Sequence, residues 1–127
     1  MTPLWLALLL PACAPVDDIL PFVAIVSPVE GDRVCGSPLV VELDVRGITL
    51  VDPYDPPDPL PKDSAHIDCM LNGQDALMSA DPHLEISGWE DGEYQLKVEL
   101  SRADHAPLEP YAGDFLYLHL ATAECDL

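Results

Sequence analysis

The chain has 127 residues, enough for one domain of ordinary size and too few for two. It carries 23 Asp and Glu against 5 Lys and Arg, a formal net charge of −18 at pH 7. A surface this acidic repels phosphate backbones and anionic lipid headgroups, which argues against binding of nucleic acid. It attracts cations or a basic partner, although an acidic surface that only keeps a domain soluble has the same composition.

The first feature along the chain is a short apolar run, Leu4 to Leu10. A membrane-spanning helix needs about 20 apolar residues, so this run has the length of a signal-peptide core and not of a membrane span. The run ends in Leu10-Pro11-Ala12-Cys13, which resembles a bacterial lipobox. The resemblance implies that residues 1–12 are a lipoprotein signal peptide, and that Cys13 becomes the lipidated N-terminus after cleavage.

Alternatives to lipidation remain open at this end of the chain. The segment before the apolar run, Met1 to Pro3, lacks the Lys or Arg of an ordinary signal peptide. Ala12-Cys13-Ala14 is also an A-x-A cleavage site, although Pro15 would then follow the cut, and a buried strand or helix is the structural alternative. If the lipobox is used, Ala14 after Cys13 implies an outer-membrane lipoprotein of the bacterial cell envelope, held in the membrane by its lipid.

Residues 13–21 form a tether that contains proline and aspartate, and residues 22–127 are predicted to fold as one domain. Within that domain apolar and polar residues alternate, which is the pattern of half-buried β-strands. Strands are expected at 22–27, 38–46, 65–71, 74–78, 83–87, 93–101 and 114–121, with 48–51 as an extension past a bulge at Gly47. The side chains expected to face the core are Leu39, Val41, Leu43, Val45, Ile67, Cys69, Leu71, Tyr94, Leu96, Val98, Leu100, Leu116, Leu118 and Leu120.

Turns and loops separate these strands. Residues 52–63 contain five prolines, which remove backbone donors and fix φ, so a stiff acidic loop is expected there. Residues 102–113 form a second loop, and Asn72-Gly73 predicts a type I′ hairpin because both central residues of that turn need positive φ. No long helix is predicted. The fold class is therefore all-β, an antiparallel β-sandwich of about seven strands after the N-terminal signal segment.

This arrangement resembles bacterial immunoglobulin-like and fibronectin-III-like modules. Ala24 to Gly31 followed by Pro38 to Leu43 is similar to the entry of such domains, and Ile86 to Leu96 is similar to the turn and tyrosine before their strand F. The resemblance covers about residues 22–125 and implies an immunoglobulin-like sandwich without the B–F disulfide of antibodies. It makes Tyr94 a candidate tyrosine corner, with an ordinary core tyrosine as the alternative. A fold of this kind does not by itself indicate a function.

If Cys13 carries lipid, Cys35, Cys69 and Cys125 remain. An oxidising compartment favours one disulfide and one free thiol among them. In the immunoglobulin-like topology the first and last strands run parallel at a sheet edge, so the resemblance implies a bond between Cys35 and Cys125. The alternative pairing joins Cys35 to Cys69, although the inward position of Cys69 suits a buried apolar residue.

Two groups of residues offer ligands to a cation. His66 and Asp68 share a strand face that is expected to point outward, and they provide part of a metal site or, alternatively, two polar groups on a solvated face. Aspartates of the 52–63 loop offer oxygen ligands to calcium, but their spacing is not that of an EF-hand and the prolines between them oppose curling around an ion. These aspartates are Asp52, Asp55, Asp58 and Asp63.

No catalytic signature is present, since the chain has neither metalloprotease histidine spacing, nor G-x-S-x-G, nor a glycine-rich phosphate loop. We therefore expect a protein that is not an enzyme and needs no cofactor, a lipid-anchored envelope module that acts by display or by contact with a protein partner. Tyr54 and Tyr111 lie on the two long loops, where exposed aromatic area suits recognition, although plain loop packing is the alternative. Binding of calcium or a transition metal is the alternative function, and carbohydrate binding is a third, with few aromatic residues to support it.

Overall fold

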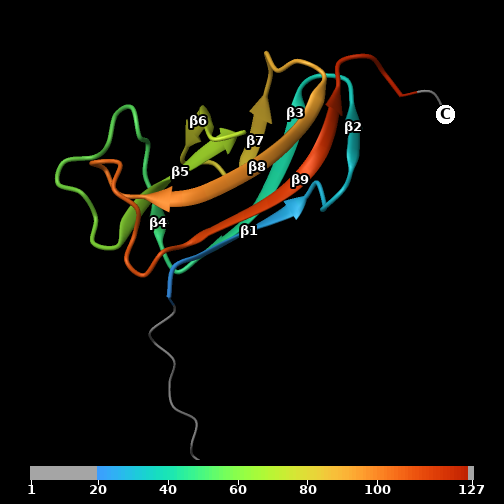
Figure 1. Cartoon of the computed structure of the whole chain (residues 1–127). Coiled ribbons are helices and arrows are strands. Elements are labelled where there is room, and N and C mark those ends of the chain that lie inside the picture. The colour runs from blue at the N-terminus through green and yellow to red at the C-terminus, as the bar shows by residue number, and fades with distance from the viewer. Residues whose placement is uncertain (1–19, 126–127) are drawn as a thin grey trace, which may run out of the picture.

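The computed structural model describes residues 20–125, so Cys13, the predicted signal peptide and most of the predicted tether lie outside the described residues. The described residues form nine strands and no helix (Figure 1). Accordingly, none of them belongs to a helix that could span a membrane. The strands are β1 (Phe22–Ser27), β2 (Arg33–Cys35), β3 (Leu39–Arg46), β4 (Thr49–Leu50), β5 (Ser64–Leu71), β6 (Gln74–Ser79), β7 (His83–Ile86), β8 (Gly92–Ser101) and β9 (Gly113–Ala121).

The strands form two sheets that pack face to face. One sheet has the order β1-β3-β7, and the other has the order β2-β9-β8-β5-β4, with β6 paired to β5. Pairing is antiparallel except where β2 joins β9 and β4 joins β5. In Figure 1 the long strands β8 and β9 cross the front of the molecule, with β3 and β7 behind them. The predicted all-β sandwich is therefore confirmed.

The count of nine strands exceeds the predicted seven because the short strand β2 was not predicted and residues 48–51 were predicted as part of the preceding strand. β2 has three residues between Gly31 and Gly36, and its pairing is visible only beside β9. The expectation that 48–51 extends the preceding strand past a bulge was wrong. Gly47 has a φ of 74°, which turns the chain, and Thr49–Leu50 then pairs with β5 in the other sheet.

The core lies between the sheets, and the two-residue period selects its members. Leu39, Val41 and Leu43 alternate with exposed Val40 and Glu42 along β3. β5, β8 and β9 contribute their inward faces in the same way, so the predicted strand phase is confirmed. Fully buried side chains from these strands are Leu39, Val41, Ile67, Cys69, Leu96, Val98, Leu100, Leu118 and Leu120.

Two turns connect the strands as the sequence predicts. Asn72 and Gly73 have φ values of 51° and 79°, the positive values that a type I′ hairpin needs. The Tyr94 hydroxyl donates to the Glu90 carbonyl at 2.7 Å and accepts from the Glu90 backbone N–H at 3.1 Å. Because this hydroxyl ties the start of β8 to backbone four residues upstream, the tyrosine corner is confirmed.

A disulfide joins Cys35 to Cys125, whose Cα atoms lie 5.2 Å apart. It is possible because β2 runs parallel to β9 and ends opposite Ala121. Cys69 is the free cysteine of the described residues and faces the core. Burial raises the pKa of its thiol to about 12, so the thiol stays protonated and behaves as an apolar side chain.

Candidate functional site

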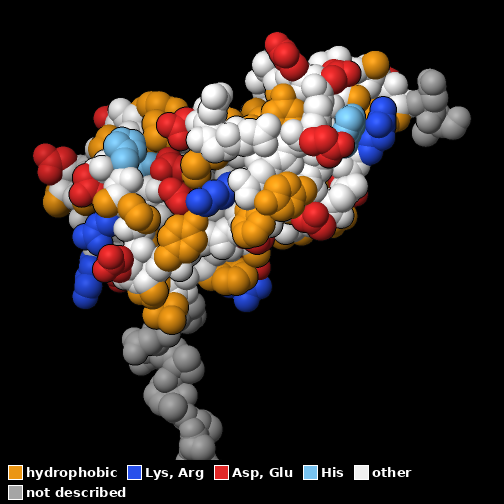
Figure 2. All heavy atoms as spheres, viewed as in Figure 1, with side chains coloured by type: hydrophobic (Ala, Val, Ile, Leu, Met, Phe, Trp, Pro, Cys, Tyr) orange, Lys and Arg blue, Asp and Glu red, His pale blue; other side chains and the backbone are white. Residues whose placement is uncertain are grey.

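One candidate surface is an aromatic strip, which we define as Tyr111, Phe115 and Tyr117. Phe115 and Tyr117 lie on β9 opposite Lys97 and Gln95 of β8, on the face of the six-stranded sheet that points away from the core. Between 53% and 55% of each residue in the strip is exposed. In Figure 2 hydrophobic side chains lie across the middle of the face in view, over β8 and β9, with a basic side chain between them and acidic side chains around them. This face therefore combines apolar contact area with an acidic border.

Tyr111, predicted as an interaction residue, is held in place by its neighbours. Its ring lies over Gly113, where an added Cβ would approach the ring to 2.5–2.8 Å. Its hydroxyl donates to Glu99 Oε1 at 3.0 Å. Partial burial and the Glu99 carboxylate raise the pKa of this phenol to about 12. The Tyr111 ring is thus fixed against Gly113 and Glu99 on one side, while about half of the residue is exposed to solvent.

Tyr54, the other predicted interaction residue, lies on the 52–63 loop with 68% of its surface exposed. Its backbone N–H donates to Asp52 Oδ1 at 2.9 Å, which shapes a local turn.

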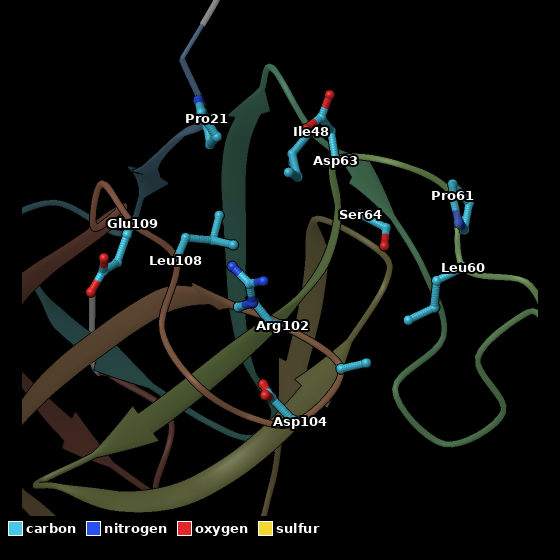
Figure 3. Close-up of a pocket in the computed structure, with 11 residues that line it drawn as sticks. Pro21, Ile48, Leu60, Pro61, Asp63, Ser64, Arg102, Asp104, Leu108 and Glu109 are labelled. Carbon is cyan, nitrogen blue, oxygen red and sulfur yellow. The ribbon is translucent and has the colours of Figure 1, made fainter.

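Between the 52–63 loop and the β8–β9 loop lies an open pocket of about 560 Å³ (Figure 3). Leu60 and Pro61 line one side of it, Arg102 and Asp104 the other, and neither predicted tyrosine belongs to it.

A second candidate is the histidine–aspartate cluster, which we define as His66, Asp68 and His105. His66 and Asp68 share the face of β5 that points away from the core between the sheets, as predicted, but the alternative that they are polar groups on a solvated face was wrong. The His66 side chain is 1% exposed and that of Asp68 16%. The β8–β9 loop covers them, and the rings of His105 and His66 meet edge to face with centroids 5.2 Å apart.

The donor atoms of the cluster converge without satisfying one another. His66 Nε2 lies 3.0 Å from Asp68 Oδ1, but the pair lacks hydrogen-bond alignment. Both ring nitrogens of His66, and Oδ1 of Asp68, are buried without a hydrogen-bond partner. The other oxygen, Asp68 Oδ2, accepts from Ser101 Oγ at 2.6 Å. A ring nitrogen of His105 completes the group. One ligand atom from each of the three residues lies within 4.8 Å of the ligand atoms of the other two.

His105 was missed by the sequence prediction because it lies 39 positions after His66, on a loop. It adopts a φ of 69°, in the left-handed region that few residues other than glycine occupy. Backbone hydrogen bonds hold that conformation, from the N–H of His105 to the Arg102 carbonyl and from the N–H of Arg102 to the Ala106 carbonyl, both at 2.8 Å. The pairing of β5 with β8 places this loop over β5, and a sequence pattern does not show that pairing.

The aspartates of the 52–63 loop, the other predicted cation ligands, do not gather in a cluster of this kind. Within residues 20–125 the histidine–aspartate cluster is the one place where three His, Cys, Asp or Glu ligand atoms gather, so Asp52, Asp55, Asp58 and Asp63 do not form such a group. Another histidine, His83, lies on the surface and makes aligned contacts with Glu42 at 2.7 Å and Glu85 at 3.0 Å. Its two nitrogens point at different carboxylates, so they do not share a common ligand position.

Comparison with known proteins shows the fold. No family model and no curated sequence matches the chain. A fibronectin(III)-like module of CbhA from Clostridium thermocellum superposes with a TM-score of 0.54 at 15% identity, covering 81% of this chain and 100% of the module. CopC from Methylosinus trichosporium superposes with a TM-score of 0.47 at 18% identity, and the match covers 85% of this chain and 99% of CopC. The PKD domain of human KIAA0319 superposes with a TM-score of 0.43 at 13% identity, and the match covers 90% of this chain and 94% of the PKD domain. The first match shows an immunoglobulin-like sandwich of the fibronectin-III type, and nothing finer.

Proposed function

We propose that this immunoglobulin-like domain is a non-enzymatic interaction module, displayed on the bacterial cell envelope through lipid on Cys13. The observation that carries the interaction role is the aromatic strip, three half-exposed rings on a sheet face that a folded core already supports. Rigid aromatic area is what binding surfaces are enriched in. The partner we propose is a protein with basic side chains, because the net charge of −18 attracts cations and Arg stacks on aromatic rings.

The anchor is tested separately from the surface. Replacing Cys13 with Ser removes the sulfur that would carry lipid, so the Cys13→Ser protein should leave the membrane fraction and become soluble. Cys69→Ala is the matched control, since it changes a buried cysteine and should leave fractionation unchanged. Membrane retention of the Cys13→Ser variant would exclude the lipobox assignment.

The surface is tested by crosslinking in the native envelope. A Phe115→Ser, Tyr117→Ser double variant removes two rings of the strip without touching the core, so crosslinks to a defined partner should be lost while the melting temperature is kept. Tyr54→Ser is the matched control, because it removes an exposed aromatic ring of the 52–63 loop that is not part of the strip. Equal crosslinking by the double variant and the wild type would rule out the strip as the contact surface.

A second candidate function is cation binding, which one specific observation favours. Buried polar atoms in folded proteins are nearly always paired, yet three ligand atoms of His66 and Asp68 are buried and unpaired. A thermal melt with calcium, zinc or copper tests this function in general. A melting temperature that rises and saturates near one equivalent supports it, and unchanged melting with every cation contradicts it.

A further inference from the structure

We infer that His66, Asp68 and His105 bind a divalent first-row transition metal, Zn²⁺ or Cu²⁺, and that Ser101 is a positioning residue for the site. The inference rests on the cation-binding function proposed above, and it names the cation class and the ligands. Two ligands come from β5, the third from the β8–β9 loop, and the positioning residue from the end of β8.

The spacing of the two buried donors fits one shared ion. Zinc ligands lie about 2.0–2.2 Å from the metal, so two ligands of one tetrahedral ion are separated by about 3.3–3.6 Å, and two ligands at a right angle, as in square-planar Cu²⁺, by about 2.8–3.1 Å. His66 Nε2 and Asp68 Oδ1 are 3.0 Å apart. They are not aligned as a hydrogen bond, whereas His83 and His119 do form aligned bonds with nearby glutamates. A cation between the lone pairs of His66 and Asp68 satisfies both atoms, which the protein alone does not.

His105 supplies the third ligand from the β8–β9 loop. Its ring stands at 72° to that of His66, and its ligand nitrogen lies within 4.8 Å of the other two donor atoms. Coordination needs this nitrogen to move inward by about 1 Å, a shift that a loop side chain can make. Because His105 is exposed, the fourth position of the ion faces solvent. Three protein ligands with one open position is a common arrangement for zinc.

The donor set selects the class of metal. Two imidazole nitrogens and one carboxylate oxygen suit Zn²⁺ or Cu²⁺, whereas Ca²⁺ and Mg²⁺ prefer ligand sets made entirely of oxygen. Cu⁺ prefers sulfur, and the nearest cysteine in sequence, Cys69, faces the core on the other side of β5. The site therefore takes a divalent ion of intermediate softness, and the acidic surface attracts such ions.

Ser101 sets the orientation of the carboxylate. Its side chain is fully buried, and its Oγ donates to Asp68 Oδ2 at 2.6 Å. That bond occupies one carboxylate oxygen and turns the other, Oδ1, toward His66. Partners of this kind fix metal ligands in place, and their loss typically lowers metal affinity about 10- to 100-fold.

The test measures Zn²⁺ and Cu²⁺ binding to the full chain, purified without a histidine tag, by titration calorimetry. We expect one equivalent of either ion to bind the wild type, and His105→Ala to weaken binding at least tenfold. His83→Ala is the matched control, a surface histidine with two carboxylate neighbours, and should bind as the wild type does. His105 is exposed, so its removal should leave the fold intact, which a melt without metal verifies.

Electron paramagnetic resonance of the Cu²⁺ complex tests Ser101 and the ligand set together. Nitrogen couplings from two imidazoles are expected in the wild type and from one in His105→Ala. Ser101→Ala should lower the affinity for Cu²⁺ about 10- to 100-fold, and Ser101→Thr should restore it. Binding of Zn²⁺ or Cu²⁺ that is unaffected by His105→Ala, or of Ca²⁺ alone, overturns this inference but keeps the cation-binding function. Absence of any saturable cation binding overturns both.

Discussion

At the scale of single residues, hydrogen bonding separates two kinds of histidine in this protein. His83 is exposed and both of its nitrogens have aligned carboxylate partners. His66 is buried and its nitrogens have none. Leaving a buried polar group unpaired costs about 1–3 kcal/mol, a large share of the stability of a small domain. Carboxylate partners satisfy both nitrogens of His83, whereas the unpaired nitrogens of His66 are the observation on which the metal site proposed above rests.

The contacts of His83 with Glu42 and Glu85 predict that the stability of the domain depends on pH. The carboxylates of Glu85 and then Glu42 accept hydrogen bonds from the His83 ring and raise the pKa of His83 above its ordinary value of 6.5. A raised folded-state pKa contributes stability that is complete below pH 6.5 and is lost as pH rises through the folded value. The urea midpoint of His83→Ala should therefore lie below that of the wild type at pH 5.5 and approach it by pH 9. A difference that stays constant or grows with pH would contradict this assignment.

At the scale of elements, the two-residue period of the strands decides which side chains are buried. On β3, Val41 is fully buried while its neighbour Val40 is 39% exposed. The prolines of residues 52–63 keep that segment out of both sheets, in agreement with the prediction. The β8–β9 loop is different, since it folds back over β5 and makes part of the sheet exterior into a second buried region.

Adjacent substitutions on β3 test the strand phase. Val41→Asp places an unpaired charge in the core and should unfold the domain, because the cost of several kcal/mol approaches a total stability of about 5–15 kcal/mol. Val40→Asp makes the same chemical change one residue earlier, on the exposed face, and should cost less than about 1 kcal/mol. Far-UV circular dichroism and urea titration measure both. Similar stability of the two variants would contradict the burial pattern.

At the scale of the whole molecule, the Cys35–Cys125 disulfide links segments 90 residues apart and ties the short edge strand β2 to the end of the domain. This link complements a core that is formed almost entirely by aliphatic side chains from both sheets. The metal site proposed here would add a second link, between β5 and the β8–β9 loop. Both links join parts of the chain that are distant in sequence.

Removing the disulfide should destabilise the domain without changing its fold. A Cys35→Ser, Cys125→Ser double variant loses the restriction that the bond places on the unfolded chain, a cost of about 2–4 kcal/mol by urea titration. In the native wild type, Cys69 should resist alkylation because its thiol is buried and has a pKa of about 12. Mass spectrometry after alkylation counts the modified cysteines. Rapid native labelling of Cys69, or an unchanged urea midpoint, would disagree with this structure.

Much of the fold was predictable from local patterns, and the candidate sites were predictable only in part. Alternation identified the long strands, and Asn72-Gly73 and Tyr94 identified their turns, because these signals act over a few residues. β2 was missed because a strand of three residues has no measurable period, and residues 48–51 were predicted as strand but assigned to the wrong sheet, because their partner β5 is not visible in a local pattern. His66 and Asp68 were recognised as possible ligands, but their burial and the contribution of His105 depend on how a distant loop packs.

The sequence by itself determined the all-β class, the inward face of each long strand and the acidic surface, since side-chain alternation and charge are properties of neighbouring residues. Only the tertiary structure decided that the face of β5 carrying His66 is covered, that His105 lies against it, and that Tyr111 packs on Gly113 beside Phe115 and Tyr117. The reason is physical. A strand pattern specifies which way a side chain points, whereas what covers that side chain depends on contacts between residues far apart in the chain.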